Sequence, residues 1–268
     1  MIGADVHSAG LSPEYRAKVR RETQYWDILL AQSDFAAEKF ESAFSSHART
    51  IVDGYPRVDV LVDPERMRAA RAATRANLGL SDDDIFVLYA PTFRDASKKA
   101  GVGYHLDIAI DFERLKQALP GNVRLGLRAH SNVRAMQLAG DEFVIDVTEF
   151  PDAQTLLAAT DVLVADYSSI MFDFAATRRP MVFFAPDLED YLEKSRGMYL
   201  DYESTVPGPL VRTTAELADA LNTVIEKGSQ AYEAKYAEFV ANYLPHEDGH
   251  AAERIADEIV RAARSQEN

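Results

Sequence analysis

Two serines and two of the three carboxylates in the stretch DVLVADYSSIMFDFAATRRPMVFF gather around one strand-to-helix turn. The apolar run 162–165 is typical of a buried strand, and it ends at Asp166. Ser168 and Ser169 follow at the start of a segment with helical patterning, and Asp173 comes four residues after Ser169. Free N–H groups in a first helical turn, together with two hydroxyls, favour a phosphate. A carboxylate one turn further on could accept hydrogen bonds from ribose hydroxyls.

The same pattern has a purely structural interpretation. Ser168 would then be only the N-cap of the helix, because a serine oxygen accepts hydrogen bonds from first-turn N–H groups. Asp173 would be a solvated residue on the helix surface. The local pattern leaves both interpretations open.

Polar side chains also accompany three other apolar runs. Thr92 and Arg94 follow residues 85–90, Arg128 and His130 follow residues 123–127, and Arg212 lies within 208–213. Ligands of parallel sheets bind at the carboxyl ends of the strands, so these side chains are expected to converge. Several arginines and a histidine at one edge suit a diphosphate. A lone histidine is more often structural, and Arg128 or Arg212 could instead pair with a buried carboxylate.

The elements that position these residues follow an alternating rhythm. Short apolar runs are separated by helical patterns, which predicts a parallel sheet covered on both faces. The expected strands are 85–90, 123–127, 143–147, 162–165, 181–185 and 208–213, and the expected helices are 111–118, 152–160, 168–177 and 214–226.

Before residue 79 the pattern differs. Helices are expected at 12–23, 33–44 and 63–77, with a strand at 26–33 and another within 50–61 that runs into a Gly-Tyr-Pro turn. Because two strands are too few for a complete sheet, residues 1–78 are predicted to be the last part of a first Rossmann-like domain. Residues 79–245 are predicted to be a nucleotide-binding Rossmann-like domain, and 246–268 a C-terminal helix after the break at LPHEDG.

Composition narrows the class of protein. The chain has 268 residues, 47% hydrophobic and 27% charged, which is a normal balance for a globular protein. It has no cysteine, which excludes disulfides and cysteine-ligated zinc. The net charge of −14 argues against nucleic acid as a partner. No apolar stretch is long enough to span a membrane, and MIGADVHSAG does not resemble a signal peptide, so a cytoplasmic protein is expected.

Two clusters of polar side chains are expected to have no role in binding. Arg68, Arg71 and Arg75 share one helix face and are predicted to form a solvated stripe. His246 and His250 have the spacing of helical metal ligands, but a third ligand is not evident. We therefore expect neither a metal site nor a cofactor.

Several motifs resemble one family. The segments VLYAPTFRD, RAH, EFPDAQTLLAATDVLVADYSSIMFDFAATRRPMVFFAPDLEDY, RGMYLDY and GPLVRTTAEL resemble the CDP-glycerol glycerophosphotransferases, and GYPRVDVL resembles the segment that precedes their second domain. The resemblance covers about residues 20–225. It implies a GT-B fold of two Rossmann-like domains. It also implies transfer of glycerol phosphate from CDP-glycerol to a hydroxyl of a lipid-linked glycerophosphate acceptor, with release of CMP, in teichoic acid biosynthesis.

The resemblance also implies residue roles. Ser168 and Ser169 would contact the diphosphate, Asp173 would lie by the nucleotide sugar, and Arg212 would neutralise phosphate charge. His130 matches a histidine implicated in catalysis. The predicted set is His130 as the catalytic residue, with Thr92, Arg94, Arg128, Asp166, Ser168, Ser169, Asp173 and Arg212 as substrate-binding residues.

One family motif is missing. A WHGTPLK-like segment, whose histidine is the expected general base, does not occur in this sequence, and His7 does not match it. A truncated CDP-alditol-binding remnant, a CDP-ribitol transferase and a capsule polymerase therefore remain alternatives. A partner or a homo-oligomer could supply the missing half. Attachment to the inner face of the membrane could come from the acceptor lipid or from the basic residues Arg16, Lys18, Arg20 and Arg21.

Overall fold

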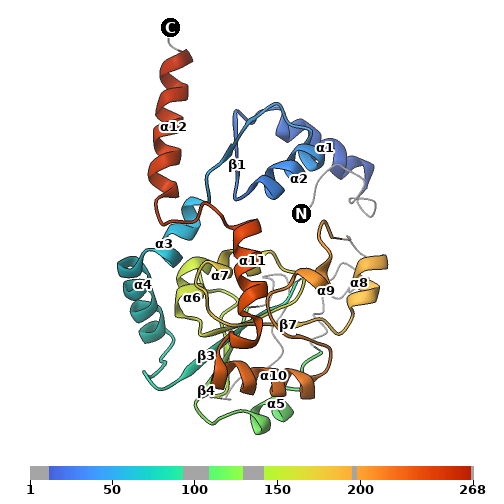
Figure 1. Cartoon of the computed structure of the whole chain (residues 1–268), viewed down its shortest axis with the longest axis vertical. Coiled ribbons are helices and arrows are strands. Elements are labelled where there is room, and N and C mark those ends of the chain that lie inside the picture. The colour runs from blue at the N-terminus through green and yellow to red at the C-terminus, as the bar shows by residue number, and fades with distance from the viewer. Residues whose placement is uncertain (1–11, 93–108, 129–141, 195–197, 267–268) are drawn as a thin grey trace.

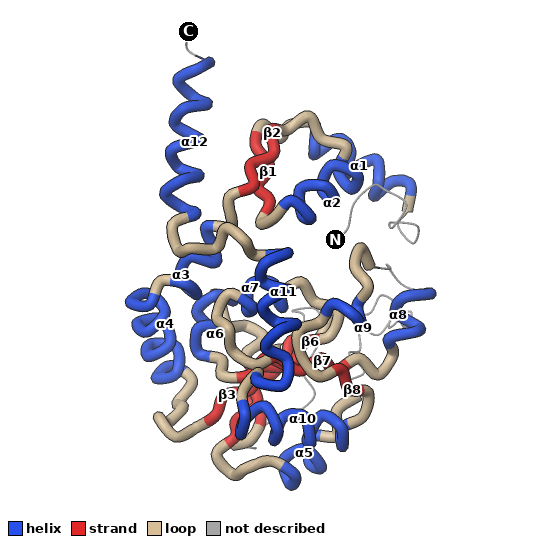
Figure 2. Tube along the Cα trace, viewed as in Figure 1, coloured by secondary structure: helices blue, strands red, loops and turns tan. Residues whose placement is uncertain are grey.

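The computed structural model describes residues 12–92, 109–128, 142–194 and 198–266. Within these residues, a six-stranded sheet with the order β5-β4-β3-β6-β7-β8 forms the centre, and every neighbouring pair is parallel (Figures 1 and 2). Its strands are β3 (Ile85–Ala90), β4 (Val123–Leu127), β5 (Val144–Asp146), β6 (Val162–Ala165), β7 (Met181–Phe184) and β8 (Leu210–Val211). This confirms the predicted parallel sheet.

The central strands are apolar because both faces of the sheet are buried. Successive side chains of a strand point to opposite faces. Phe86 and Leu88 of β3 therefore enter one hydrophobic cluster, whereas Val87 and Tyr89 enter the other. A parallel sheet covered on both sides needs such continuous apolar runs.

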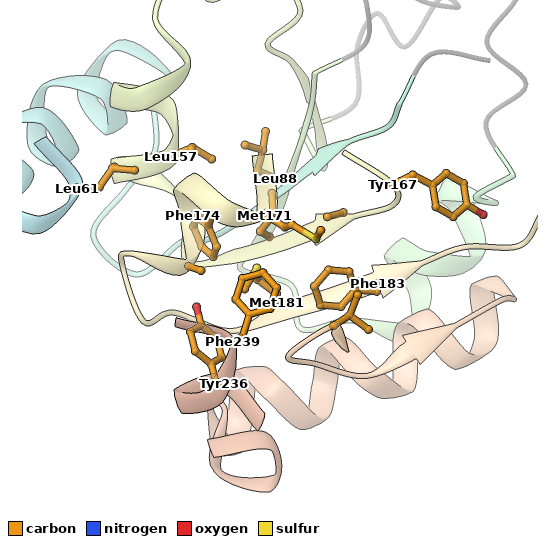
Figure 3. Close-up of a cluster of buried hydrophobic side chains, with 14 of the residues drawn as sticks. Leu61, Leu88, Leu157, Tyr167, Met171, Phe174, Met181, Phe183, Tyr236 and Phe239 are labelled. Carbon is orange, nitrogen blue, oxygen red and sulfur yellow. The ribbon is translucent and has the colours of Figure 1, made fainter. Parts of the chain in front are cut away.

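Helices form a layer on each face. On one face lie α4 (Pro64–Asn77), α6 (Ala153–Ala159), α7 (Ile170–Ala175) and α11 (Glu233–Tyr243). On the other face lie α5 (Phe112–Ala118) and α10 (Thr214–Lys227). Figure 3 shows Leu157 of α6, Phe174 of α7 and Phe239 of α11 packed over side chains of the strands. Together these layers bury the main core of the molecule.

Gly126 on β4 permits the close packing of two neighbouring strands. A Cβ atom added there would lie 2.5 Å from the ring of Phe86 on β3. A larger residue would therefore displace that ring from the core.

A smaller sheet precedes the large one. It consists of β1 (Ile28–Ala31) and β2 (Arg49–Val52), which pair in parallel, with α1 (Pro13–Thr23) and α2 (Asp34–Phe44) beside them. The ring of Phe35 on α2 contacts Tyr243 of α11, with centroids 5.0 Å apart. The helix α12 (Ala251–Gln266) extends away from the large sheet, near β2 (Figure 1). An ion pair between Arg49 and Glu258 joins β2 to this helix.

Short elements connect these parts. They are η2 (Pro56–Val58), α3 (Asp59–Val62), α8 (Leu188–Lys194), α9 (Tyr202–Thr205) and η4 (Gln230–Tyr232).

The strand predicted to run into a Gly-Tyr-Pro turn within 50–61 is present as β2, and the sequence did not indicate the short helices that follow the turn. The chain leaves the sheet after Val52, because Gly54 adopts a positive φ of 75° and Pro56 has no N–H for a sheet ladder. Residues 56–62 form η2 and α3 instead. The other predicted elements exist, although β1 and β8 are shorter than expected.

The predicted boundary at residue 78 stays a prediction. The helices α3 and α4 lie before it in sequence, yet Leu61, Met67 and Ala70 from these helices pack into the core of the six-stranded sheet.

Candidate functional site

The carboxyl ends of β3 and β6 are joined by one buried carboxylate. Asp166 is 1% exposed, and its side chain accepts hydrogen bonds from the backbone N–H of Thr92 at 2.7 Å and from the Thr92 hydroxyl at 2.6 Å. The backbone N–H of Ser168 also donates to Asp166, at 3.2 Å. The hydroxyl of Tyr202 donates to the carbonyl of Asp166 at 2.6 Å. The structure thus brings Thr92, Asp166 and Ser168 together, with the Asp166 carboxylate holding two loops in place.

The two serines lie at the entrance to α7. Ser168 is half-buried, and its hydroxyl oxygen accepts a long hydrogen bond of 3.4 Å from the backbone N–H of Ile170. Ser169 is exposed and makes no side-chain capping bond, although it is the N-cap residue. The capping role predicted as an alternative for Ser168 therefore has some support, while Ser169 presents its hydroxyl to the surface.

Asp173 has an arginine partner that the sequence did not indicate. Its carboxylate accepts hydrogen bonds from Nε and Nη2 of Arg57, at 2.8 and 3.1 Å, and from Nε2 of Gln154 at 2.9 Å. The side chain of Asp173 is 10% exposed, whereas that of Arg57 is 53% exposed. The interpretation of Asp173 as a solvated helix residue is therefore wrong.

A second buried carboxyl lies beside this pair. Oε1 of Glu247 accepts hydrogen bonds from Nε2 of Gln32 at 2.7 Å and from the backbone N–H of Tyr55 at 3.0 Å. Among the described residues, neither Oε2 of Glu247 nor Oε1 of Gln154, both of them buried, has a hydrogen-bond partner. Burial is the main reason why the pKa of Glu247 is raised to about 7. Gly54 packs directly against this group, because a Cβ there would lie 3.0 Å from Oε2.

The arginines at the other strand ends have partners within the protein. Nη1 of Arg128 donates to the carbonyl of Phe150 at 2.9 Å. Arg212 pairs through Nη1 with Glu189 and through Nη2 with Glu203, the latter at 3.2 Å. Arg128 therefore braces the loop after β5, while Arg212 shares its charge with two acidic side chains.

Two predicted site residues cannot be placed. His130 and Arg94 lie outside the described residues. Among the residues that the structure describes, no group of three or more His, Cys, Asp or Glu side chains is arranged to hold a metal ion.

The residues missed from the sequence share a location between the two sheets. They are Gln32, Tyr55, Arg57, Gln154 and Glu247. The sequence signal that points to two of them is GYPRVDVL, which contains Tyr55 and Arg57 and resembles the family segment before the second domain. The sequence around Glu247 indicates only a turn.

The predicted solvated stripe on α4 is wrong for two of its three arginines. Arg71 and Arg75 both pair with Asp161, at 2.6 and 3.2 Å, next to the amino end of β6. They fasten α4 to the edge of the sheet opposite the serines.

Comparison with known proteins gives a family. The model of the CDP-glycerol:poly(glycerophosphate) glycerophosphotransferase family matches residues 2–261. A teichoic acid glycerol-phosphate transferase of Staphylococcus aureus is 34% identical over 97% of this chain and 68% of its own length. Teichoic acid poly(glycerol phosphate) polymerases of Bacillus subtilis and Bacillus spizizenii are 32% and 34% identical, and the chain spans 35% and 65% of their lengths.

Solved structures agree on the fold. A structure of the wall teichoic acid polymerase TagF, soaked with CDPG, superposes with a TM-score of 0.87 at 32% identity, over 100% of this chain and 66% of that one. A UDP-GlcNAc 2-epimerase from Neisseria meningitidis superposes with a TM-score of 0.51 at 14% identity, covering 88% of this chain and 61% of that one. The chain therefore has the GT-B-like, Rossmann-type architecture that was predicted.

Proposed function

Because the chain belongs to the CDP-glycerol:poly(glycerophosphate) glycerophosphotransferase family, we propose that it transfers glycerol phosphate from CDP-glycerol to a hydroxyl of a lipid-linked glycerophosphate acceptor. The reaction releases CMP and extends or primes a teichoic acid of the cell wall. The observation that carries the proposal is the Thr92–Asp166–Ser168 network, which fixes the serine turn at the carboxyl edge of the sheet. That edge is where α/β sheets bind nucleotides.

The residues divide into scaffold and ligand contacts. Asp166 is buried, so its proposed role is to hold the loops of β3 and β6 rather than to touch the donor. Ser168 and Ser169 contribute hydroxyls to the diphosphate, with Ser169 the more accessible of the two. Arg212 lies at the end of β8, and its side chain is 43% exposed, which leaves room for a phosphate to compete with its acidic partners.

The chemistry requires charge stabilisation more than covalent participation by the protein. Attack on the β-phosphate spreads negative charge over the phosphoryl oxygens and the departing CMP. Hydrogen-bond donors and cations held in place before the reaction can supply most of the acceleration. His130, placed by the family resemblance, would stabilise or protonate the leaving group.

A second donor has a specific observation in its favour. A teichoic acid ribitol-phosphate primase of Bacillus spizizenii is 33% identical over 93% of this chain and 63% of its own length. CDP-ribitol therefore competes with CDP-glycerol as the proposed donor. Donor binding without transfer is the further alternative, which a turnover assay separates from both.

The acceptor implies contact with a membrane surface. In the part of the chain that the structure describes, no helix is both long and apolar enough to cross a bilayer. The basic residues Lys18, Arg20 and Arg21 are exposed on α1, and Tyr25 just beyond the helix is 84% exposed. Cations beside an aromatic ring suit peripheral attachment to anionic lipid. The predicted partner or homo-oligomer stays a prediction.

Calorimetry followed by a CMP-release assay tests the proposal. The chain is titrated with CDP-glycerol, with CDP-ribitol and UDP-glucose as comparison ligands, and turnover is then measured with a lipid-linked acceptor. Selective binding with acceptor-dependent CMP release supports a glycerol phosphate transferase. Binding without release favours the remnant, and preference for CDP-ribitol favours the second donor. His130→Ala should reduce turnover more than binding.

A further inference from the structure

The guanidinium of Arg57 has one edge in use and one edge available. Nε and Nη2 donate to the two carboxylate oxygens of Asp173, at 2.8 and 3.1 Å. Among the described residues, none accepts a hydrogen bond from Nη1. The side chain is 53% exposed, so the unused edge reaches solvent. A fixed guanidinium with a free edge is well suited to bind a phosphoryl oxygen.

Two contacts hold Arg57 in this orientation. The guanidinium carbon lies 4.2 Å from the ring centroid of Tyr55, a cation–π arrangement. Asp173 is itself held by Nε2 of Gln154 at 2.9 Å. Because the arginine is positioned on two sides, it would lose little further conformational entropy when a ligand binds.

Arg57 also lies close to the serine turn. Asp173 follows Ser169 by four residues, and both belong to the start of α7, so they share a helix face. Arg57 reaches this face from η2, which connects the smaller sheet to the larger one. Its cation therefore binds α7 one helical turn beyond Ser169.

Asp173 has little capacity left for a ligand. Three hydrogen bonds already occupy its carboxylate, and 10% of its side chain is exposed. A carboxylate accepts about four such bonds in total. One acceptor position therefore remains, and two ribose hydroxyls could bind Asp173 only by displacing Arg57 or Gln154.

We propose that Arg57 binds a phosphoryl oxygen of the substrate, and that Asp173 is the positioning residue that orients it. This inference rests on the proposed function for the identity of the substrate, and it assigns the ligand contact to Arg57 in place of Asp173. The phosphoryl group belongs either to the diphosphate of the donor or to the glycerol phosphate of the acceptor.

Comparing ligands that carry phosphate with one that does not tests the role of Arg57. Arg57→Gln should weaken binding of CDP-glycerol or of short poly(glycerol phosphate) by about 10–100-fold, because a charge-assisted hydrogen bond is lost. Binding of uncharged cytidine, followed by ligand-observed NMR, should not change. Arg57→Lys should restore part of the affinity, since the charge returns without the planar fork. A loss with CDP-glycerol identifies the donor phosphate as the ligand, and a loss with the polymer identifies the acceptor phosphate.

A matched control separates charge from position. Arg66 is 54% exposed and pairs with Asp63 at 3.9 Å, so Arg66→Gln removes an equally exposed guanidinium from a different surface. That variant should bind both phosphorylated ligands as the unmodified chain does. Thermal melts of all variants confirm folding, and Arg57→Lys keeps a cation beside Asp173 if Arg57→Gln does not fold.

Asp173→Asn tests the positioning role. It should weaken the phosphorylated ligands and leave cytidine unchanged. If cytidine binding falls as well, Asp173 touches the nucleoside directly and its assignment as a positioning residue is overturned.

Failure of this inference is distinguishable from failure of the proposed function. If the unmodified chain binds CDP-glycerol and Arg57→Gln binds both phosphorylated ligands equally well, the inference about Arg57 is overturned and the proposed function stands. If the unmodified chain ignores CDP-glycerol but binds pyrophosphate in a manner that needs Arg57, the proposed function fails and the inference stands. If Arg57→Gln and Arg66→Gln weaken binding equally, the effect is general electrostatics and the inference is overturned.

Discussion

Two arginine–carboxylate clusters lie at opposite edges of the large sheet, and they use the same chemistry differently. At the amino edge, Asp161 accepts hydrogen bonds from Arg71 at 2.6 Å, from Arg75 at 3.2 Å and from the backbone N–H of Phe86 at 2.8 Å. At the other edge, Asp173 accepts two bonds from Arg57. One cluster fastens α4 to the sheet, whereas the other presents a cation.

The difference lies in the remaining guanidinium donors. Nη2 of Arg75 donates to the carbonyls of Ser81 and Asp84, both at 2.7 Å, and its side chain is 9% exposed. Nη1 of Arg71 donates to the carbonyl of Ala159 at 2.8 Å. Backbone carbonyls thus engage the remaining arginine donors at the amino edge, while Arg57 is more than half exposed. The guanidinium donors that do not bind the carboxylate therefore distinguish the two roles. Where protein carbonyls accept from them, the arginine maintains the fold; where they face solvent, it can bind a ligand.

Breaking the amino-edge cluster should have the largest effect on stability. Asp161→Ala leaves two arginines and the backbone N–H of Phe86 without their acceptor. The free energy of unfolding should fall by about 3 kcal/mol, as expected for a partly buried pair that loses one partner. Denaturant titration measures it, and the affinity for CDP-glycerol should not change. A loss below about 1 kcal/mol would show that this cluster is merely a surface ion pair.

Glu247 lies beside the Asp173–Arg57 pair and should make the free energy of unfolding depend on pH. Its folded pKa is raised to about 7, mainly by burial, so the folded state binds a proton more tightly than the unfolded chain. Stability should therefore be highest below the unfolded pKa of about 4.3 and should fall as pH rises towards 7. The loss should be about 2 kcal/mol after allowance for partial solvent screening.

Glu247→Gln removes this titration and keeps an acceptor for Gln32 and Tyr55. Denaturation of both forms between pH 4 and 8 should give curves that diverge over that window, with the variant less sensitive to pH. The charged groups that act on Glu247 include Asp173, Asp59 and Arg57, which are present in both forms. Parallel curves would mean that Glu247 is ionised throughout.

The serine turn should contribute less than the arginine. Ser168→Ala combined with Ser169→Ala removes two hydroxyl donors and leaves the Asp166 network intact. The affinity for CDP-glycerol should fall about 10-fold, as expected for neutral donors to a phosphate. Calorimetry measures it, with the half-buried scaffold variant Thr92→Val as a comparison that acts mainly on stability. Unchanged affinity in the double variant would remove these serines from the site.

Arg212 pairs with exposed carboxylates, unlike the arginines of the two clusters, and its substitution should have the smallest effect on stability. Both of its acidic partners are more than 60% exposed, at 64% and 61%. Water screens such pairs, so Arg212→Gln should leave the free energy of unfolding close to that of the unmodified chain, as denaturant titration would measure. A larger loss would mean that exposure alone does not separate structural arginines from available ones.

Local patterns were sufficient for most of the fold. Alternating apolar runs and helical segments predicted the parallel sheet, since side chains buried on both faces leave a continuous apolar signature in each strand. Ser12 and Asp63 cap α1 and α4 as their sequences predict, because a cap bonds to N–H groups within three residues. The turn at Gly54 and Pro56 was also predictable, because both residues interrupt a strand, whereas the short helices η2 and α3 after it left no local signal.

The site was predictable only in part. Asp166 and the serines could be found because they follow a strand directly, and strand ends meet at one edge of a parallel sheet. Arg57 could not be assigned, since its partner Asp173 is 116 residues away in sequence. The residues Gln32 and Glu247 are 215 apart, and no periodic pattern relates them.

The sequence by itself determined which segments are strands and helices, which faces are buried, and which polar residues lie at strand ends, because these depend on neighbours a few positions away. Tertiary structure alone decided which carboxylate each arginine pairs with. That choice depends on how η2 and the segment before α12 cross between the two sheets, and this crossing places side chains together irrespective of their separation along the chain.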